Sequence, residues 1–424
     1  MPHLIRFRIA AFASALVLTT NVLAAQTPVT AEQFFDDSVV DGIYLTINPR
    51  DWNELKANFQ LNDYYAAHMT WRNVTVRNVA IRSRGVGSRN GVKPGLRVDF
   101  NRFVPSQDFL GLKSVVLRNN TQDPSGLHER LSMLFFTRMG LPASREAHAR
   151  LYVNGEYVGL YTIVETVDKP FLRTRFGEDD GYLYEYDYER EDLPYYFEYR
   201  GPDPALYSPK PFQPQTHELD PDPQPLVDMI EATNRVPDSD FLSVVGRYID
   251  LPTFMTYLAI ENFIANIDGV AGDYGMNNFY LYRFSHQLLS TFVPWDESEA
   301  FKGGIDHGIW HNIADVPSSL RNRLVEAALR VPSLAARYID ALARCADLAR
   351  PPAAAAPLDV ADGEPGWLEQ EISREYQQVR QATLDDRFTQ FTSEEFEEEI
   401  ERLLLFARTR SDVVRRQIAG ARER

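Results

Sequence analysis

The stretch "REAHARLYVNGEYVGLYTIVETVDK", Arg145 to Lys169, is the strongest indication of the fold in this sequence. Asn154 and Gly155 stand between two runs in which aromatic and aliphatic residues alternate with other residues. An Asn-Gly pair in this setting predicts a β-hairpin, because both residues adopt the positive φ angles that a tight two-residue turn requires. The stretch is therefore predicted to form two adjacent antiparallel strands.

The residues before the hairpin are predicted to be mostly strands with one main helix. From Val39 to Phe100, strand patterns such as "VTVRNVAIRSRG" and "LRVDF" enclose a short helical segment and the glycine-bearing loop "RGVGSRNGVKPG". The main helix is predicted in "DPSGLHERLSMLFFTRMGLP", with Asp123 as its cap, Pro124 at its first position and Gly140 just past its end. The range 25–165 is thus expected to be a β-rich unit.

After the hairpin the chain is predicted to become helical. An irregular insert rich in Tyr, Pro and Asp is expected near 184–222, and a helix that opens at "DLP" is expected to continue to about Asn262. The loop "NIDGVAGDYGMNN", two strands and further helices from about 317 follow. A β-rich N-terminal lobe with one main helix, followed by an α-rich C-terminal lobe over 166–424, predicts an α+β fold with the two-lobe order of a kinase-like protein.

Composition and charge limit the classes of partner. The chain is 44% hydrophobic and carries a formal net charge of -16, so neither nucleic acid nor an anionic membrane surface is expected as the main partner. Its single cysteine, Cys345, permits no internal disulfide and no cysteine-rich zinc site. Packing is therefore expected to provide the stability of the fold.

The first residues are predicted to be a secretory signal peptide. Arg6 and Arg8 precede the apolar run Ile9 to Thr20, and Val22-Leu23-Ala24 has the small residues of a cleavage site. The alternative is an uncleaved membrane anchor. No later stretch is apolar for long enough to span a bilayer. We therefore expect a signal peptide over 1–24 and an exported protein in the periplasm, at the cell surface or outside the cell, with no stable membrane span in the mature chain.

A second informative stretch is "FVPWDESEAFKGG", Phe292 to Gly304. It crowds Asp296, Glu297 and Glu299 into four residues directly after an apolar run. Because like charges repel at this spacing, either water or a bound cation must stabilise them. Solvation is the commoner outcome for an acidic loop, so the stretch alone leaves both alternatives open.

Several stretches in the expected order resemble the spore coat protein H (CotH) kinase family, whose members are secreted or coat-associated proteins with an atypical kinase fold. They lie between Arg82 and Gly304 and span roughly half of the chain. The hairpin and the pair "NNFYLYR" and "FVPWD" are the most specific. The other matching stretches are "RSRGVGS", "KPGLRVDFNRF", "DPSGLHERLSMLFFTRMGLPA" and "NIDG".

The resemblance implies ATP and Mg²⁺ or Mn²⁺ as cofactors, and phosphate transfer to Ser or Thr of a protein substrate whose identity is unknown. It makes Asp268 the catalytic-loop carboxylate, Asp296 the metal carboxylate, and Asn278 or its neighbour Asn277 the second metal-binding group. From the residues alone, a loop cap and a turn remain the alternatives for Asp268 and for the Asn pair. Glu165 ends the hairpin where the lobes would join, so the backbone beside it is expected to hydrogen-bond adenine, while its side chain could be structural.

The phosphate-binding cation is expected after the glycine loop that contains Gly85 and Gly87. Lys93 follows this loop closely, and Arg97 competes because it lies inside the next strand. Glu129, near the start of the main helix, is the expected ion-pair partner of whichever cation binds phosphate. The alternative for Glu129 is a solvated glutamate that the helix dipole favours.

One position departs from the family pattern. The usual Trp-Asp-x-Asp is "WDES" in this chain, with Ser298 where a second carboxylate is common. Glu297 and Glu299 are poor substitutes, because neighbouring side chains on an extended segment point in other directions. Two other functions therefore remain open. One is a non-catalytic, pseudokinase-type binding protein of the envelope or the extracellular space. The other is nucleotidyl transfer, which requires the same binding of metal and phosphate.

Overall fold

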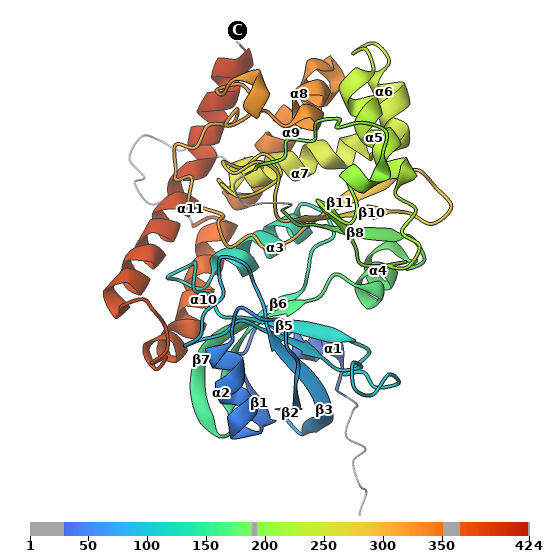
Figure 1. The fold of residues 1–424 in the computed structure, drawn as a ribbon. Helices are drawn as coiled ribbons and strands as arrows, with labels where there is room; N and C mark the ends of the chain where they lie inside the picture. The colour runs from blue at the N-terminus through green and yellow to red at the C-terminus, as the bar shows by residue number, and fades with distance from the viewer. Residues whose placement is uncertain (1–28, 189–192, 351–364, 423–424) are drawn as a thin grey trace, which may run out of the picture.

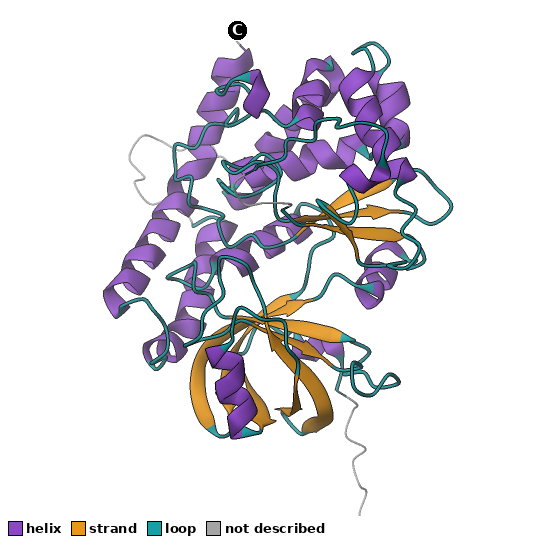
Figure 2. Cartoon of the chain, viewed as in Figure 1, coloured by secondary structure: helices purple, strands orange, loops and turns teal. Residues whose placement is uncertain are grey.

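The computed structural model describes residues 29–188, 193–350 and 365–422, and it shows a mixed α+β chain (Figure 1). The strands of a barrel lie at one end and most of the helices at the other, as Figure 2 shows. The signal peptide predicted over 1–24 lies outside the described residues. Within them, no helix combines the length and the apolar character that crossing a membrane requires.

Seven strands close into a barrel in the order β1-β2-β3-β4-β5-β7-β6. Neighbouring strands are antiparallel except β1 and β6, which run parallel and close the barrel. Buried aromatic and aliphatic side chains, Trp71 and Tyr161 among them, fill its interior. The strands are β1 Asp41–Ile47, β2 Tyr65–Trp71, β3 Val74–Ser83, β4 Leu96–Asp99, β5 Ser114–Arg118, β6 Glu146–Val153 and β7 Glu156–Glu165.

The predicted hairpin forms β6 and β7, with Asn154 at φ 52° and Gly155 at φ 88° in its turn. Gly159 within β7 has a φ of 129°, and a Cβ atom there would collide with the carboxylate of Asp386. Glycine is therefore required at this position for a second reason, since Asp386 belongs to a distant segment that packs onto the strand. The hairpin thus connects the barrel to the C-terminal part of the chain.

A second sheet of four strands, in the order β11-β10-β8-β9, lies beyond the barrel (Figure 1). The two strands predicted after the polar loop are β10 and β11. The region near 184–222, expected to be irregular, contributes most of β8 and all of β9, because its aromatic residues are buried rather than exposed. The strands are β8 Tyr182–Tyr186, β9 Phe212–Pro214, β10 Phe279–Arg283 and β11 Ser290–Pro294.

Eleven α-helices lie within the described residues, and α11 runs along one side of the molecule, from near the barrel to the C-terminus at the opposite end (Figure 1). A single large hydrophobic core joins most of them. The helices are α1 Ala31–Phe34, α2 Pro49–Ala57, α3 His128–Arg138, α4 Lys169–Phe176, α5 Gln224–Arg235, α6 Phe241–Val244, α7 Leu251–Phe263, α8 Arg323–Arg330, α9 Pro332–Ala349, α10 Trp367–Leu384 and α11 Ser393–Arg422.

The main predicted helix, α3, begins later than its sequence signals suggest. Pro124 is not its first residue, because the helix starts at His128. Asp123 instead organises the preceding turn, where its carboxylate accepts hydrogen bonds from the backbone N–H groups of Ser125 and His128, both at 2.8 Å. Asp123 therefore accepts a hydrogen bond from the first backbone N–H group of α3, but it does so from a turn that precedes the helix.

Candidate functional site

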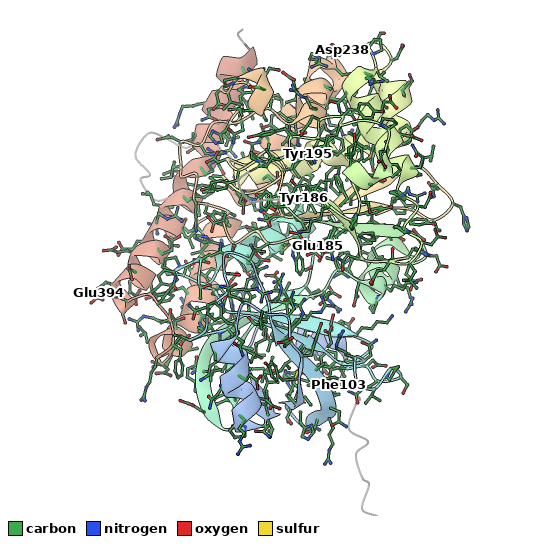
Figure 3. The ribbon with its side chains drawn as sticks, viewed as in Figure 1. Phe103, Glu185, Tyr186, Tyr195, Asp238 and Glu394 are labelled. Atoms are coloured by element: carbon green, nitrogen blue, oxygen red, sulfur yellow. The ribbon has the colours of Figure 1, made fainter. Side chains whose placement is uncertain are left out.

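A cavity of about 640 Å³ opens between the β3–β4 loop of the barrel and the second sheet. Glu185 and Tyr186, which line it, lie between the barrel and the helices in Figure 3. The cavity wall brings together six of the residues that the sequence predicts for a functional site. They are Gly85, Gly87, Asp268, Asn277, Asn278 and Asp296.

Asp268 lies in the loop after α7, where the side chain of Asn266 accepts a hydrogen bond from its backbone N–H at 2.9 Å. The side-chain amide of Asn277 lies 3.0 Å from Asp268 Oδ1, and that of Asn278 lies 3.0 Å from Oδ2. Burial raises the pKa of Asp268 to about 6, and the negative charge of Asp296 adds to the increase. The two asparagines therefore orient this carboxylate, for which the described residues show no ion pair.

The raised pKa of Asp268 leads to a prediction of pH-dependent stability. Because the folded chain holds this proton more tightly than the unfolded chain, ionisation destabilises the fold as the pH rises from about 4 to 6. Above about pH 6 we expect Asp268→Asn to exceed the wild type in free energy of unfolding by up to about 3 kcal/mol. Urea denaturation in metal-free buffer across this range measures the difference, and a difference that does not change with pH would contradict the prediction.

Asp296 lies two residues after the end of β11 and has a φ of 54°, a left-handed conformation that is uncommon for residues other than glycine. Its Oδ1 atom accepts hydrogen bonds from Arg118 Nη1 at 2.6 Å and from Ser298 Oγ at 2.9 Å. Burial by itself would raise the pKa of Asp296, but Arg118 and Arg84 hold it below its ordinary value. This carboxylate is therefore ionised and faces the cavity. Backbone strain of this kind is often found at functional sites.

Arg118 connects Asp296 to helix α3. It is the last residue of β5, and its Nη2 atom lies 3.0 Å from Glu129 Oε1. Burial raises the pKa of Glu129 to about 7, whereas Arg118 acts to lower it. Arg118 was not predicted from the sequence, because the ion-pair partner of Glu129 was expected to follow the glycine loop. The available signal was the strand "SVVLR", which comes directly before the segment of the main helix.

Arg84 is a second cation that the sequence reasoning missed. It begins the β3–β4 loop and lines the cavity, with its guanidinium carbon 5.4 Å from the centre of the Trp295 ring. Within the described residues, no hydrogen bond or ion pair joins its side chain to another group. Burial lowers the pKa of Arg84, and the positive charge of Arg118 lowers it further. An anion entering the cavity would therefore meet an arginine that interacts with Asp296 and Glu185 through their charges but, within the described residues, is held by neither in an ion pair.

The two cations that the sequence predicts for phosphate, Lys93 and Arg97, do not line the cavity. Lys93 Nζ lies 2.7 Å from Asp386 Oδ2, and both side chains are buried. Arg97 Nε lies 2.8 Å from Asp99 Oδ1 within the same strand. The structure thus brings neither of them to Asp268 or Asp296.

The side chain of Glu165 is also engaged elsewhere. Its carboxylate pairs with Arg145 at 2.6 Å and with Arg175 at 3.0 Å, so it ties β7 to the start of β6 and to α4. Its own backbone N–H donates to the carbonyl of Arg145 at 3.0 Å. The side chain therefore has the structural role that the sequence left open as an alternative.

The acidic neighbours of Asp296 have partners of their own. Glu297 is fully buried and accepts a hydrogen bond from the side chain of Asn266 at 2.7 Å. Glu299 accepts one from Lys302 at 2.7 Å and one from Gln122 at 3.3 Å. Neither of these two residues lines the cavity, whereas Asp296 and Ser298 do.

Three comparisons with known proteins gave matches. The family model described as CotH kinase protein matches residues 81–414. Inner spore coat protein H of Bacillus subtilis (strain 168) is 28% identical over 257 residues, which cover 59% of this chain and 66% of that protein, just under two thirds of its length. The crystal structure of a Helicobacter pylori proinflammatory kinase, CtkA, aligns with 77% of this chain and 95% of that chain at 10% identity. Its TM-score of 0.30 is too low to support an argument.

Proposed function

The chain belongs to the CotH kinase protein family, and from this premise we propose that it is an exported kinase that transfers phosphate from ATP to Ser or Thr hydroxyls of a protein. In this proposal the barrel is the β-rich lobe, the helical part is the α-rich lobe, and the nucleotide binds in the cavity between them. The observation that carries the proposal is the meeting of Asp268, Asn277, Asn278 and Asp296 in one cavity that the glycine loop also lines.

The residues of the wall fit a divalent cation. Mg²⁺ and Mn²⁺ prefer oxygen ligands, and Asp296 and the side-chain carbonyls of the two asparagines would supply them beside the carboxylate of Asp268. The raised pKa of Asp268 supports this assignment, because a buried carboxylate close to another one is relieved by a cation. When bound there, Mg²⁺ or Mn²⁺ would neutralise charge on the phosphate oxygens.

Protein groups can perform the remaining tasks of phosphoryl transfer. Asp268 would accept the proton of the acceptor hydroxyl as its oxygen bonds to the γ-phosphorus, while the bond to the β–γ bridging oxygen breaks and ADP leaves. Arg84 would hold phosphate oxygens from the side of the glycine loop. The Arg118–Glu129 pair, at 3.0 Å, stands in for the strand-to-helix ion pair that orders the site in protein kinases.

Export to the envelope or the cell surface is part of the proposal. It is supported by the signal sequence predicted over 1–24 and by the name of the Bacillus subtilis relative, which is a spore coat protein.

The decisive experiment compares ATP labelled at the α phosphate with ATP labelled at the γ phosphate, using the purified mature protein with Mg²⁺ or Mn²⁺. We expect label from the γ position alone to reach a protein acceptor. Label transferred from the α position would indicate nucleotidyl transfer instead. A wild-type melting temperature that ignores metal and ATP together would contradict both activities.

A non-catalytic binding protein is the second candidate, and one contact favours it. Ser298 replaces the second acid and donates its hydroxyl to Asp296 at 2.9 Å, so the site has one carboxylate fewer for metal than is usual in the family. A protein that is stabilised by metal and ATP but transfers no label would support this candidate.

A further inference from the structure

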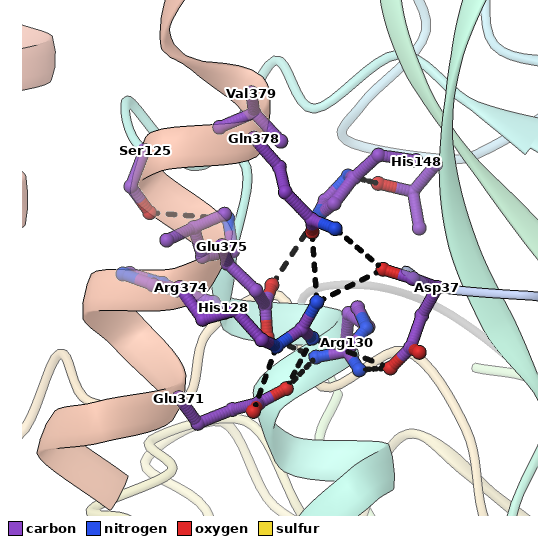
Figure 4. A network of polar contacts seen from close by, with 12 residues as sticks. Asp37, Ser125, His128, Arg130, His148, Glu371, Arg374, Glu375, Gln378 and Val379 are labelled. Carbon is purple, nitrogen blue, oxygen red and sulfur yellow. Dashed lines mark hydrogen bonds and ion pairs between the residues drawn. The ribbon is translucent and has the colours of Figure 1, made fainter. Parts of the chain in front are cut away.

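Three consecutive residues at the start of α3 face three different parts of the molecule. Glu129 faces the candidate site through Arg118, at 3.0 Å. Arg130, one residue later, pairs with Glu371 of α10 at 2.8 Å and also with Glu375, as Figure 4 shows. His128, one residue earlier, contacts α11. The first turn of α3 is therefore tied to both C-terminal helices.

His128 also contacts the loop that follows Asp296. Its Nε2 atom lies 2.6 Å from Glu399 Oε1 on α11, and its Nδ1 atom lies 3.1 Å from the carbonyl oxygen of Ser298. Because a carboxylate and a carbonyl only accept hydrogen bonds, both ring nitrogens must donate, and the imidazole is cationic. His128 is fully buried, so it provides a fixed link from α11 through α3 to Ser298.

Helix α11 holds the same loop at a second point. Arg402, one turn after Glu399 and paired with it, donates to the carbonyl oxygen of Phe301 at 2.8 Å. Two turns further, the buried Arg410 donates to the carbonyl oxygens of Asn262 and Phe263 at 2.7 and 2.9 Å. These last contacts fix the end of α7, which leads into the loop of Asp268. One helix thus fixes backbone on both sides of the candidate site.

The cluster around His128 could also be considered a metal site, because ligand atoms of Asp123, His128 and Glu399 lie within 4.8 Å of one another. Their hydrogen bonds argue against it. Arg402 already pairs with Glu399, and the backbone N–H of His128 donates to Asp123 at 2.8 Å. A metal would meet a guanidinium and a cationic imidazole, so the cluster is better explained as a link between structural elements.

We propose that α11 is an intramolecular brace for the segment Asp296 to Phe301, with His128, Glu399 and Arg402 as its positioning residues. In many protein kinases the segment after the metal-binding aspartate switches between ordered and disordered states. Here the carbonyl group of Ser298 is held by His128 of α3, and the carbonyl group of Phe301 is held by Arg402 of α11. The brace would keep Asp296 where metal and nucleotide require it, so this inference rests on the proposed function. A shift of about 1 Å at such a group can cost about a hundredfold in rate.

The test compares Glu399→Ala with the matched variant Glu397→Ala in the full chain. Glu397 lies two residues away on α11 and pairs with Arg380 of α10 at 2.8 Å, so its loss removes an ion pair that does not involve α3. The first readout is hydrogen exchange at the amides of Ala300 and Phe301. The second is the affinity for Mn²⁺ with ATP, measured by calorimetry.

We expect Glu399→Ala to speed exchange at these amides about tenfold and to weaken Mn²⁺·ATP binding about tenfold, as is usual for coupling through packed networks. Glu397→Ala should change neither the exchange rates nor the Mn²⁺·ATP affinity by more than about twofold.

Equal exchange rates in the two variants would overturn the brace. Faster exchange in Glu399→Ala with an unchanged affinity for Mn²⁺·ATP would also overturn it. If the wild type binds no Mn²⁺·ATP, the proposed function fails, and the exchange rates alone decide whether the brace exists. If Glu399→Ala does not fold, Glu399→Gln removes the charge at equal size, and exchange no faster than in the wild type would overturn the proposal.

Discussion

Replacing Asp296 by Asn should abolish metal-dependent nucleotide binding and phosphate transfer. The substitution keeps the size of the side chain and removes the negative charge that would hold the cation. In the wild type, Mn²⁺ and ATP together should raise the melting temperature, because a ligand that binds the folded state stabilises it. In Asp296→Asn the same addition should have no effect on melting, and label from γ-labelled ATP should not be transferred.

The matched control is Ser298→Ala, which removes the hydroxyl that donates to Asp296 at 2.9 Å and keeps the carboxylate. This variant should retain the metal-dependent shift in melting temperature. A shift of wild-type size in Asp296→Asn would show that the cation does not need this carboxylate, and it would remove the main support for the proposed function.

The structure changes one part of this prediction. From the sequence, the loss of a carboxylate beside other acids is expected to leave stability unchanged or to raise it. In the fold, however, Asp296 accepts a hydrogen bond from the buried Arg118 at 2.6 Å. We therefore expect Asp296→Asn to lower the free energy of unfolding by about 1 to 3 kcal/mol, which is typical of hydrogen bonds to charged groups.

The acidic wall of the site could be predicted because its parts follow local signals. Asp268 comes after a helix, the Asn277-Asn278 pair precedes β10, and Asp296 comes after β11. Since β10 and β11 pair with Phe279 opposite Pro294, Asn278 and Trp295 become neighbours, and the N–H of Trp295 donates to the carbonyl of Asn278 at 3.2 Å. The pairing of β10 with β11, which are close in sequence, thus explains most of why these acidic and amide side chains lie near one another.

The cations could not be assigned in the same way, because their partners are chosen by long-range packing. Arg118 meets Asp296, 178 residues later in the chain, only when the barrel docks against the second sheet. Lys93 and Asp386 are 293 residues apart. Nothing in the sequence beside Lys93 indicates that a turn after α10 will supply a buried carboxylate. The glycine loop therefore lines the cavity, whereas Lys93, which follows it, does not.

The buried pair of Lys93 and Asp386 leads to the last prediction. Lys93→Met should lower the free energy of unfolding by about 3 to 5 kcal/mol, because it leaves the charge of Asp386 buried without its cation. The side chains of Lys93 and Asp386 are only 4% and 1% exposed, so water cannot replace the lost partner. ATP affinity should be unchanged, since Lys93 does not line the cavity.

Arg84→Ala should have the opposite effects. We expect it to weaken the affinity for ATP by about 1.5 to 3 kcal/mol and to change the free energy of unfolding little.

Adding Asp386→Asn to Lys93→Met separates the loss of charge from the loss of packing. Asp386 also accepts hydrogen bonds from the backbone N–H groups of Leu160, at 3.1 Å, and Phe388, at 2.9 Å. Asn keeps one oxygen, which can accept the bonds from Phe388 and Thr389, but it loses the bond from Leu160. Because it also removes the unpaired charge, part of the lost stability should return in the double variant. Urea denaturation measures the stabilities, and calorimetry measures the ATP affinities. If Lys93→Met instead unfolded like the wild type and lost ATP binding, Lys93 would return as the phosphate-binding cation, and the assignment of Arg84 would be wrong.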